Sequence, residues 1–152
     1  TFDQSAKVII NHVTDGVRIA EKALLPKAVV DFIRTHHGLG KAKYFYNSFK
    51  NQYPDKEIDE KVFTYPGPNP FSKETAVLMM ADSVEAASRS LKEHTEESIK
   101  QLVDKIIDGQ IADGLLKSAP LTFRDVETIK SVFVDKLKTM FHTRISYPDL
   151  KK

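Results

Sequence analysis

Apolar residues recur every three or four positions along most of the chain, which is the period of an amphipathic helix. The pattern predicts six helices. Their expected ranges are 6–24, 26–37, 41–52, 72–91, 95–109 and 122–141. Ser72, Thr95 and Thr122 stand where a side-chain oxygen can accept a hydrogen bond from the first helical turn, so each is expected to cap the helix that follows it. Gly38 is expected to end the second helix, because glycine readily adopts the left-handed backbone of a C-terminal cap.

The segment Tyr-Pro-Gly-Pro-Asn-Pro at positions 65–70 interrupts the helical pattern. Its three prolines remove backbone donors and fix the chain in an extended or turn geometry, so an ordered loop is expected there. No stretch of the chain shows the alternation of a β-strand. The sequence therefore predicts an all-α fold, a helical bundle that forms a single domain over residues 1–152.

The composition narrows the chemistry that this domain can carry. With 23 Lys and Arg against 21 Asp and Glu, the formal charge is +2, which is too balanced for a nucleic-acid-binding surface. The chain has no cysteine, so a metal could bind only to His, Asp or Glu side chains. No apolar run approaches the roughly 20 residues needed to cross a bilayer, and a soluble chain is expected.

Four polar residues fall on helix faces that should be buried, namely His12, His36, His37 and Asp82. A single buried histidine is commonly a core residue bonded to a backbone carbonyl, and this remains an alternative for His12. A buried carboxylate needs a partner, which for Asp82 could be a cation or a salt bridge, for example to Arg89.

Taken together, three inward-facing imidazoles and one carboxylate on three helices favour a site for Mn, Fe, Co or Zn. Adjacent imidazoles such as His36 and His37, at the end of a helix, can both approach one cation. The remaining histidines, His94 and His142, lie at a helix junction and near the end of the last helix. We expect them to be solvated or structural.

Several motifs occur in a fixed order along the chain. They are Ile-Asn-His-Val-Thr-Asp-Gly at 10–16, Leu-Pro at 25–26, Phe-Ile-Arg-Thr-His-His-Gly at 32–38, Lys-Tyr-Phe-Tyr at 43–46, Phe-Thr-Tyr-Pro-Gly-Pro at 63–68, Ala-Asp-Ser-Val-Glu-Ala-Ala-Ser-Arg-Ser-Leu at 81–91 and His-Thr-Arg-Ile-Ser-Tyr-Pro at 142–148. Because it carries these motifs in this order, the chain resembles the C-terminal part of the HD domain in bacterial seven-transmembrane HD phosphodiesterases. The resemblance covers nearly the whole sequence.

The resemblance implies an HD-domain-like bundle on the cytoplasmic face of the bacterial inner membrane that hydrolyses cyclic di-AMP to the linear dinucleotide pApA. It implies a centre of two transition-metal ions, Mn or Fe. His12, His36 and His37 would ligate one ion, and Asp82 would ligate the other. Membrane contact would come only through transmembrane segments that this sequence does not contain, and the sequence is compatible with a homodimer.

One departure from the family is the absence of the His-Asp dipeptide that names it, whose aspartate bridges both metals. No such dipeptide occurs in this sequence. Because the chain starts at Thr1 without a methionine, we expect a domain that is incomplete at its N-terminus. We also expect that the chain alone holds one ion or none and is inactive, since the two-metal displacement needs both ions.

Two further residues are candidates for substrate contact. Tyr65 could stack on a base, although the loop that carries it could equally be a structural connector. Arg89 lies seven residues after Asp82, on roughly the same helix face. It could contact a substrate phosphate, or it could brace Asp82 or Glu85, and bracing is the favoured interpretation.

Two other functions compete with this one. The related HD-GYP group hydrolyses cyclic di-GMP, but an acidic residue and a later Gly-Tyr-Pro triplet follow its histidine doublet, whereas Gly38, Leu39 and Gly40 follow here. A degenerate module that binds a nucleotide or a partner without catalysis is the third interpretation. A His-Asp pair encoded upstream of Thr1 would count against it.

Overall fold

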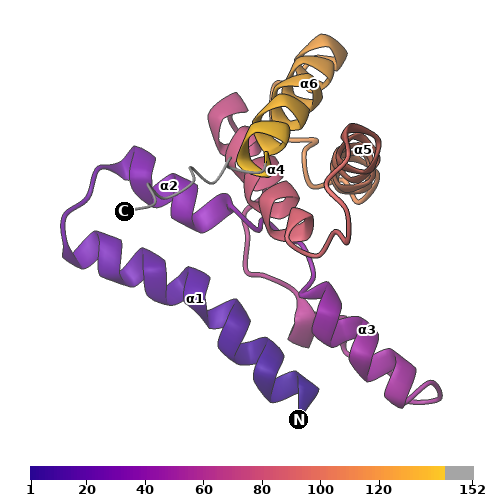
Figure 1. Ribbon diagram of the computed structural model, residues 1–152. Coiled ribbons are helices and arrows are strands. Elements are labelled where there is room, and N and C mark those ends of the chain that lie inside the picture. Colours follow the sequence, from indigo (N-terminus) through magenta and orange to yellow (C-terminus); the bar gives the residue numbers. More distant parts are fainter. Residues whose placement is uncertain (143–152) are drawn as a thin grey trace, which may run out of the picture.

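The computed structural model describes residues 1–142, and within them the chain forms six α-helices, one short 3-10 helix and no β-strand. In chain order they are α1 (Phe2–Lys22), α2 (Lys27–Thr35), α3 (Lys43–Gln52), η1 (Glu60–Phe63), α4 (Lys73–Ser88), α5 (Glu96–Ala112) and α6 (Phe123–Met140), as Figure 1 shows. The all-α prediction is therefore confirmed. Residues 143–148 of the last family motif lie outside the described residues.

The predicted helix starts are confirmed by their caps. Ser72, Thr95 and Thr122 each accept a hydrogen bond from the backbone N–H three residues later, at 3.1, 3.1 and 3.0 Å. In each case the side chain at that later position bonds back to the backbone of the cap, which satisfies two amides that the helix leaves free.

Several helix ends differ from the prediction: α1 runs from Phe2 to Lys22 rather than over 6–24, and α4 ends at Ser88 rather than at 91. The second helix ends at Thr35 rather than at the histidine doublet, so His36 is its C-terminal cap and His37 lies beyond it. Gly38 then turns the chain with a φ of +53°, a conformation that costs a side-chain-bearing residue energy. The fifth helix continues past Gly109 to Ala112, because tertiary packing overrides the cost of about 1 kcal/mol for a glycine inside a helix.

The helices pack around two hydrophobic clusters. The larger lies among α4, α5 and α6 and comprises Ala76, Met79, Met80, Val84, Ile99, Val103, Ile107, Leu116 and Leu137. The smaller comprises Val13, Ala42 and Tyr65. In Figure 1, α4 lies in the middle of the molecule, in contact with α5 and α6 and, separately, with α2.

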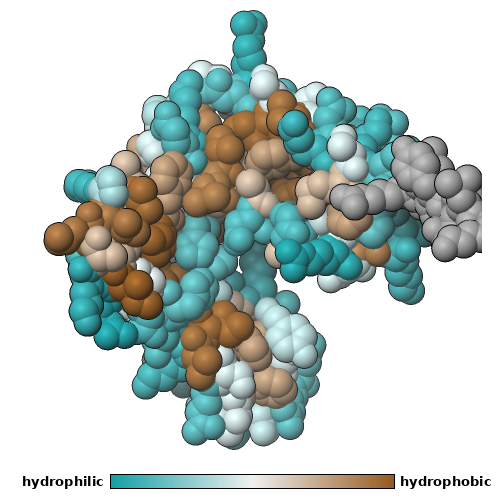
Figure 2. Space-filling view, turned by 60° about the vertical axis from the view of Figure 1, so that its left-hand side comes forward, coloured by the Kyte–Doolittle hydropathy of each residue, from teal (hydrophilic) through white to brown (hydrophobic). Residues whose placement is uncertain are grey.

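The apolar stripe predicted for the first helix is buried only in part. Ala6, Val13 and Ala20 are buried, but Val8 is 74% exposed and Ile9 is 42% exposed. The reason is that α1 packs on α2, α3 and η1, and no described element covers its other side. Figure 2 shows separate apolar patches on one face of the molecule. No helix among the described residues is long and apolar enough to span a membrane.

The larger cluster should supply most of the stability of α4, α5 and α6. We predict that Ile107→Ala lowers the free energy of unfolding by about 2–5 kcal/mol, because the removed methylene groups leave a cavity in a well-packed site. Ile107 is fully buried. The measurement is urea denaturation of the purified chain.

Ile111→Ala is the matched control, one turn further along α5, where the isoleucine is 46% exposed. It should cost less than about 1 kcal/mol. Equal losses for the two variants would contradict the core assignment.

Candidate metal centre

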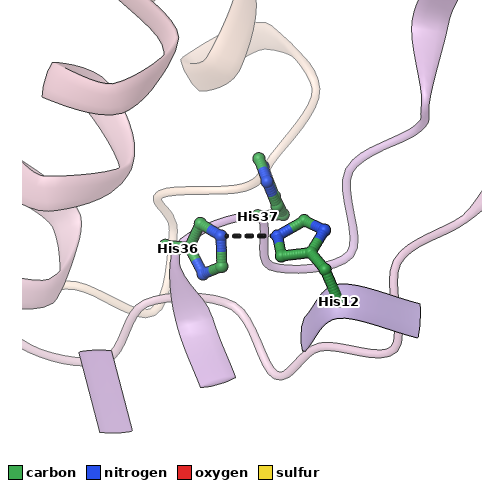
Figure 3. A group of neighbouring side chains, drawn as sticks. All are labelled: His12, His36 and His37. Carbon is green, nitrogen blue, oxygen red and sulfur yellow. Dashed lines mark hydrogen bonds between the residues drawn. The ribbon is translucent and has the colours of Figure 1, made fainter. Parts of the chain in front are cut away.

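Three histidines from two adjacent segments converge on one point. His12 is exposed rather than buried as predicted, because α2 covers only part of this face of α1. It projects from α1 towards His36 and His37 at the end of α2, as Figure 3 shows. One ring nitrogen of each histidine lies within 4.8 Å of those of the other two. The contact between α1 and α2 therefore brings together residues that are 24 positions apart in the chain.

Backbone carbonyls fix the orientation of two of these rings. The Nδ1 atom of His12 is bonded to the carbonyl of Ile9, and Nδ1 of His36 is bonded to the carbonyl of Ile33 at 2.6 Å. A carbonyl only accepts, so each Nδ1 carries the hydrogen and each Nε2 is left with a free lone pair. Bonds of this kind commonly orient metal-binding imidazoles.

The two free nitrogens face each other. His12 Nε2 lies 3.0 Å from His36 Nε2 (Figure 3). Two lone pairs at this distance repel unless a proton or a cation lies between them. Two nitrogens bound at about 2.1 Å to one cation, at a right angle, would be about 3.0 Å apart. The donor set therefore fits a transition-metal ion.

His37 is held in its neutral form. Burial, followed by the nearby His36 and His12, lowers the pKa of its imidazole from 6.5 to about 4. Its ring stacks on Tyr65 at a centroid distance of 4.2 Å and an angle of 20°. A neutral, immobilised imidazole is the form that binds a metal.

The proline-rich loop holds the chain that follows the doublet. Tyr65 N–H donates to the carbonyl of Gly40 at 2.9 Å, and Leu39 N–H donates to Asn69 Oδ1 at 2.8 Å. A side chain at Gly38 would collide with this loop, because its Cβ would lie 2.6 Å from Asn69 Oδ1. The loop therefore positions the doublet, and the connector interpretation describes its contacts correctly.

Asp82 does not lie in a buried stripe, contrary to the sequence-based expectation. It is exposed on α4, because α2, which faces this part of α4, leaves a small cavity of about 240 Å³ beside it. His36 lines the same cavity. Burial of the Tyr65 hydroxyl raises its pKa, and the negative charge of Asp82 raises it further. Asp82 is thus beside the histidines without joining their cluster.

A larger cavity of about 810 Å³ lies beside the doublet. His36, His37 and Tyr65 form part of its wall. Three lysines also line it. Lys41 is paired with Glu60 at 2.6 Å and Lys43 with Asp113 at 3.2 Å, while Lys105 forms no ion pair within the described residues. The size is typical of a small-molecule site, about 300–1,000 Å³.

The two residues expected to contact substrate have different surroundings. Tyr65 is buried and has His37 stacked on its ring, but it still lines the larger cavity. Arg89 is exposed and bonds to Glu85 at 2.7 Å, which is the bracing contact favoured from the sequence. Its contact with a substrate phosphate stays a prediction.

The other histidines lie elsewhere. His94 Nε2 is 3.0 Å from the carbonyl of Ser88, and its ring stacks on Phe141 at 3.7 Å. His142 is exposed after the end of α6. His94 is structural and His142 solvated, as expected.

Sequence reasoning missed the cavity lysines and Gln110. Nothing in the sequence marks Lys41, Lys43 or Lys105 among 23 basic residues. Gln110 did leave a signal, because it follows Ile107 by three and Ile106 by four and so continues the apolar stripe of α5.

No protein-family model matches the chain. It is 41% identical over 148 residues to the "Cyclic-di-AMP phosphodiesterase PgpH" of Bacillus subtilis (strain 168), covering 97% of this chain and 20% of that protein. The protein of the same name in Listeria monocytogenes serotype 1/2a is 36% identical over 151 residues, covering 99% of this chain and 21% of that protein.

The decisive likeness is to a solved structure. The crystal structure of the L. monocytogenes PgpH HD domain in complex with cyclic-di-AMP matches with a TM-score of 0.88 and 35% identity, covering 97% of this chain and 68% of that one. The chain belongs to the PgpH HD-domain family. The family expected from the sequence motifs is thereby confirmed. The chain spans about a fifth of the length of the curated PgpH relatives that it matches.

The lowered pKa of His37 predicts how the stability of the metal-free protein depends on pH. The unfolded imidazole takes up a proton near pH 6.5, but the folded one does so only near pH 4. The unfolded state therefore binds more protons between these values, and stability should fall as the pH drops from 6.5 to 4. We expect His37 to account for about 1–2 kcal/mol of this loss, after allowing for its partial exposure.

The measurement is urea denaturation in the presence of a chelator at several pH values. His37→Gln is the comparison, because it cannot titrate, and its stability should fall less over this range. Parallel curves for the two proteins would contradict the assignment.

Proposed function

We propose that this chain is the C-terminal part of an HD phosphodiesterase domain that hydrolyses cyclic di-AMP to pApA. The observation that carries the proposal is the convergence of three imidazoles, two of which, His36 and His37, line a cavity of about 810 Å³. The names of the PgpH relatives, and the cyclic-di-AMP in the matching crystal structure, support this substrate.

In the proposed site His12, His36 and His37 hold one divalent ion, Mn or Fe. Asp82 would ligate a second ion, since it lines one cavity with His36. When bound, such ions activate a water and neutralise the charge on the phosphate oxygens. The chain has no His-Asp dipeptide, so a bridging carboxylate would come from a part of the protein outside this sequence.

The chain's own residues prepare the site before substrate binds. The carbonyls of Ile9 and Ile33 direct two Nε2 lone pairs to one point, so no reorientation is needed. Burial keeps His37 unprotonated at neutral pH. The lysines that line the larger cavity attract the phosphates of a dinucleotide, and Tyr65 forms part of the wall against its base.

The complete protein is proposed to lie at the cytoplasmic face of the bacterial inner membrane, with this domain in the cytoplasm. Cyclic di-GMP hydrolysis of the HD-GYP type has no support in the relatives, which are named for cyclic-di-AMP. A non-catalytic module is the less favoured function, because it gives no role to three imidazoles that meet at one point.

Removing one imidazole should abolish turnover. In the full-length protein with Mn, His36→Ala or His37→Ala should lower cyclic di-AMP hydrolysis by more than about 100-fold. Loss of a residue that only hydrogen-bonds to a metal ligand already lowers metal affinity or activity by about 10- to 100-fold, and here a ligand itself is lost. Product formation and bound metal are measured, and far-UV circular dichroism should show unchanged helicity. His142→Ala, an exposed histidine, is the control. Full turnover in both site variants would refute the assignment.

The isolated chain of residues 1–152 should not hydrolyse cyclic di-AMP, because it lacks the carboxylate that would bridge two ions. Product analysis after incubation with Mn tests this, with the full-length protein as the positive control. Efficient cleavage by the chain alone would show that the His-Asp pair is dispensable.

A further inference from the structure

The wall of the larger cavity carries, besides its charged residues, a hydrogen-bonded pair of neutral polar side chains. Gln110 of α5 donates from Nε2 to Ser83 Oγ of α4 at 2.8 Å, and both residues line the cavity with the histidine doublet. The neighbouring wall is formed by Met79, Ile106 and Leu115. The pair therefore adds neutral polar groups to a wall that also carries apolar and charged side chains.

This pair is not satisfied by the protein. Gln110 is only 9% exposed, and its Oε1 is buried with no hydrogen-bond partner. An unpaired buried acceptor costs about 1–3 kcal/mol. Ser83 Oγ accepts from Gln110, and no hydrogen bond in residues 1–142 uses its own hydrogen. One acceptor and one donor thus stand side by side without partners.

We propose that Gln110 and Ser83 select the base of the dinucleotide substrate by recognising a 6-aminopurine edge. The exocyclic amine donates to Gln110 Oε1, and Ser83 donates its hydroxyl hydrogen to an adjacent ring nitrogen. The terminal torsion of a glutamine is broad, so the amide can turn its oxygen from its buried position towards the cavity, and Nε2 then gives up its bond to Ser83 Oγ. This inference rests on the proposed function, because it assumes a cyclic dinucleotide in this cavity.

The arrangement disfavours a 6-oxopurine held in the same way. Guanine and hypoxanthine place an acceptor oxygen where adenine has its amine, so that oxygen would face Gln110 Oε1. A site built to receive a donor discriminates strongly against an analogue that lacks it, because the polar group of the site then stays unpaired. The pair therefore supplies base selectivity, separately from the histidines, which act on the phosphate.

The test compares two substrates in the full-length protein with Mn, namely cyclic di-AMP and cyclic di-IMP, which carries a 6-oxo group. In Gln110→Met the acceptor is lost at similar side-chain length. The preference for cyclic di-AMP, expressed as the ratio of the two kcat/KM values, should fall about 10- to 100-fold. The change should lie mainly in KM, with kcat and bound metal nearly unchanged.

Two further variants keep the result interpretable. Gln101→Met alters an exposed glutamine of the same helix, which bonds to Glu97, and should leave the ratio unchanged. Ser83→Ala should also raise KM for cyclic di-AMP. An equal loss of kcat/KM for both substrates in Gln110→Met, or no loss at all, would overturn the inference.

Failure of the proposed function gives a different result. If the wild-type protein does not hydrolyse cyclic di-AMP, the dissociation constants of both dinucleotides for wild type and Gln110→Met decide the role of Gln110 alone. A wild-type preference for cyclic di-AMP that Gln110→Met removes supports the base-selecting pair without catalysis. Equal affinity of the wild type for both dinucleotides, or no binding of either, overturns it.

Discussion

The structure depends on two imidazole nitrogens that face each other with their lone pairs free. His12 Nε2 and His36 Nε2 lie 3.0 Å apart, and the carbonyls that hold each Nδ1 prevent either ring from presenting a hydrogen to the other without losing a bond. Such a contact is unfavourable unless a proton or cation relieves it. The packing of α1 on α2 therefore maintains a site whose chemistry is completed from outside the polypeptide.

Two cavities lie next to this contact, and each is lined by a different set of side chains. The smaller lies between His36 and Asp82, and the larger lies between the doublet and α5. The first brings a carboxylate near the histidines, and the second offers lysines, Tyr65 and the Gln110–Ser83 pair to a ligand. Since α4 carries both Asp82 and Ser83, adjacent residues of one helix serve the metal side and the base side of the proposed site.

Much of the fold and part of the site followed from the sequence. Helical periodicity predicted the six helices. Ser72, Thr95 and Thr122 predicted where three of these helices begin, and the capping hydrogen bonds confirm all three. The three histidines were singled out because a polar imidazole on an apolar helix face costs free energy unless it has a hydrogen-bond or metal partner. The exposure of Val8 and of Asp82 was not predictable, because periodicity identifies a helix face without saying whether another element covers it.

The sequence by itself determined local matters: which segments are helical, where they are capped, that the chain turns at Gly38, and that only His, Asp or Glu could bind a metal. These depend on backbone preferences and on the chemistry of single residues. Only the tertiary structure decided that His12 meets His36, that Tyr65 stacks on His37, and that Gln110 shares a cavity with both histidines of the doublet. Distances between residues far apart in the chain arise from how helices pack, and no local pattern encodes them.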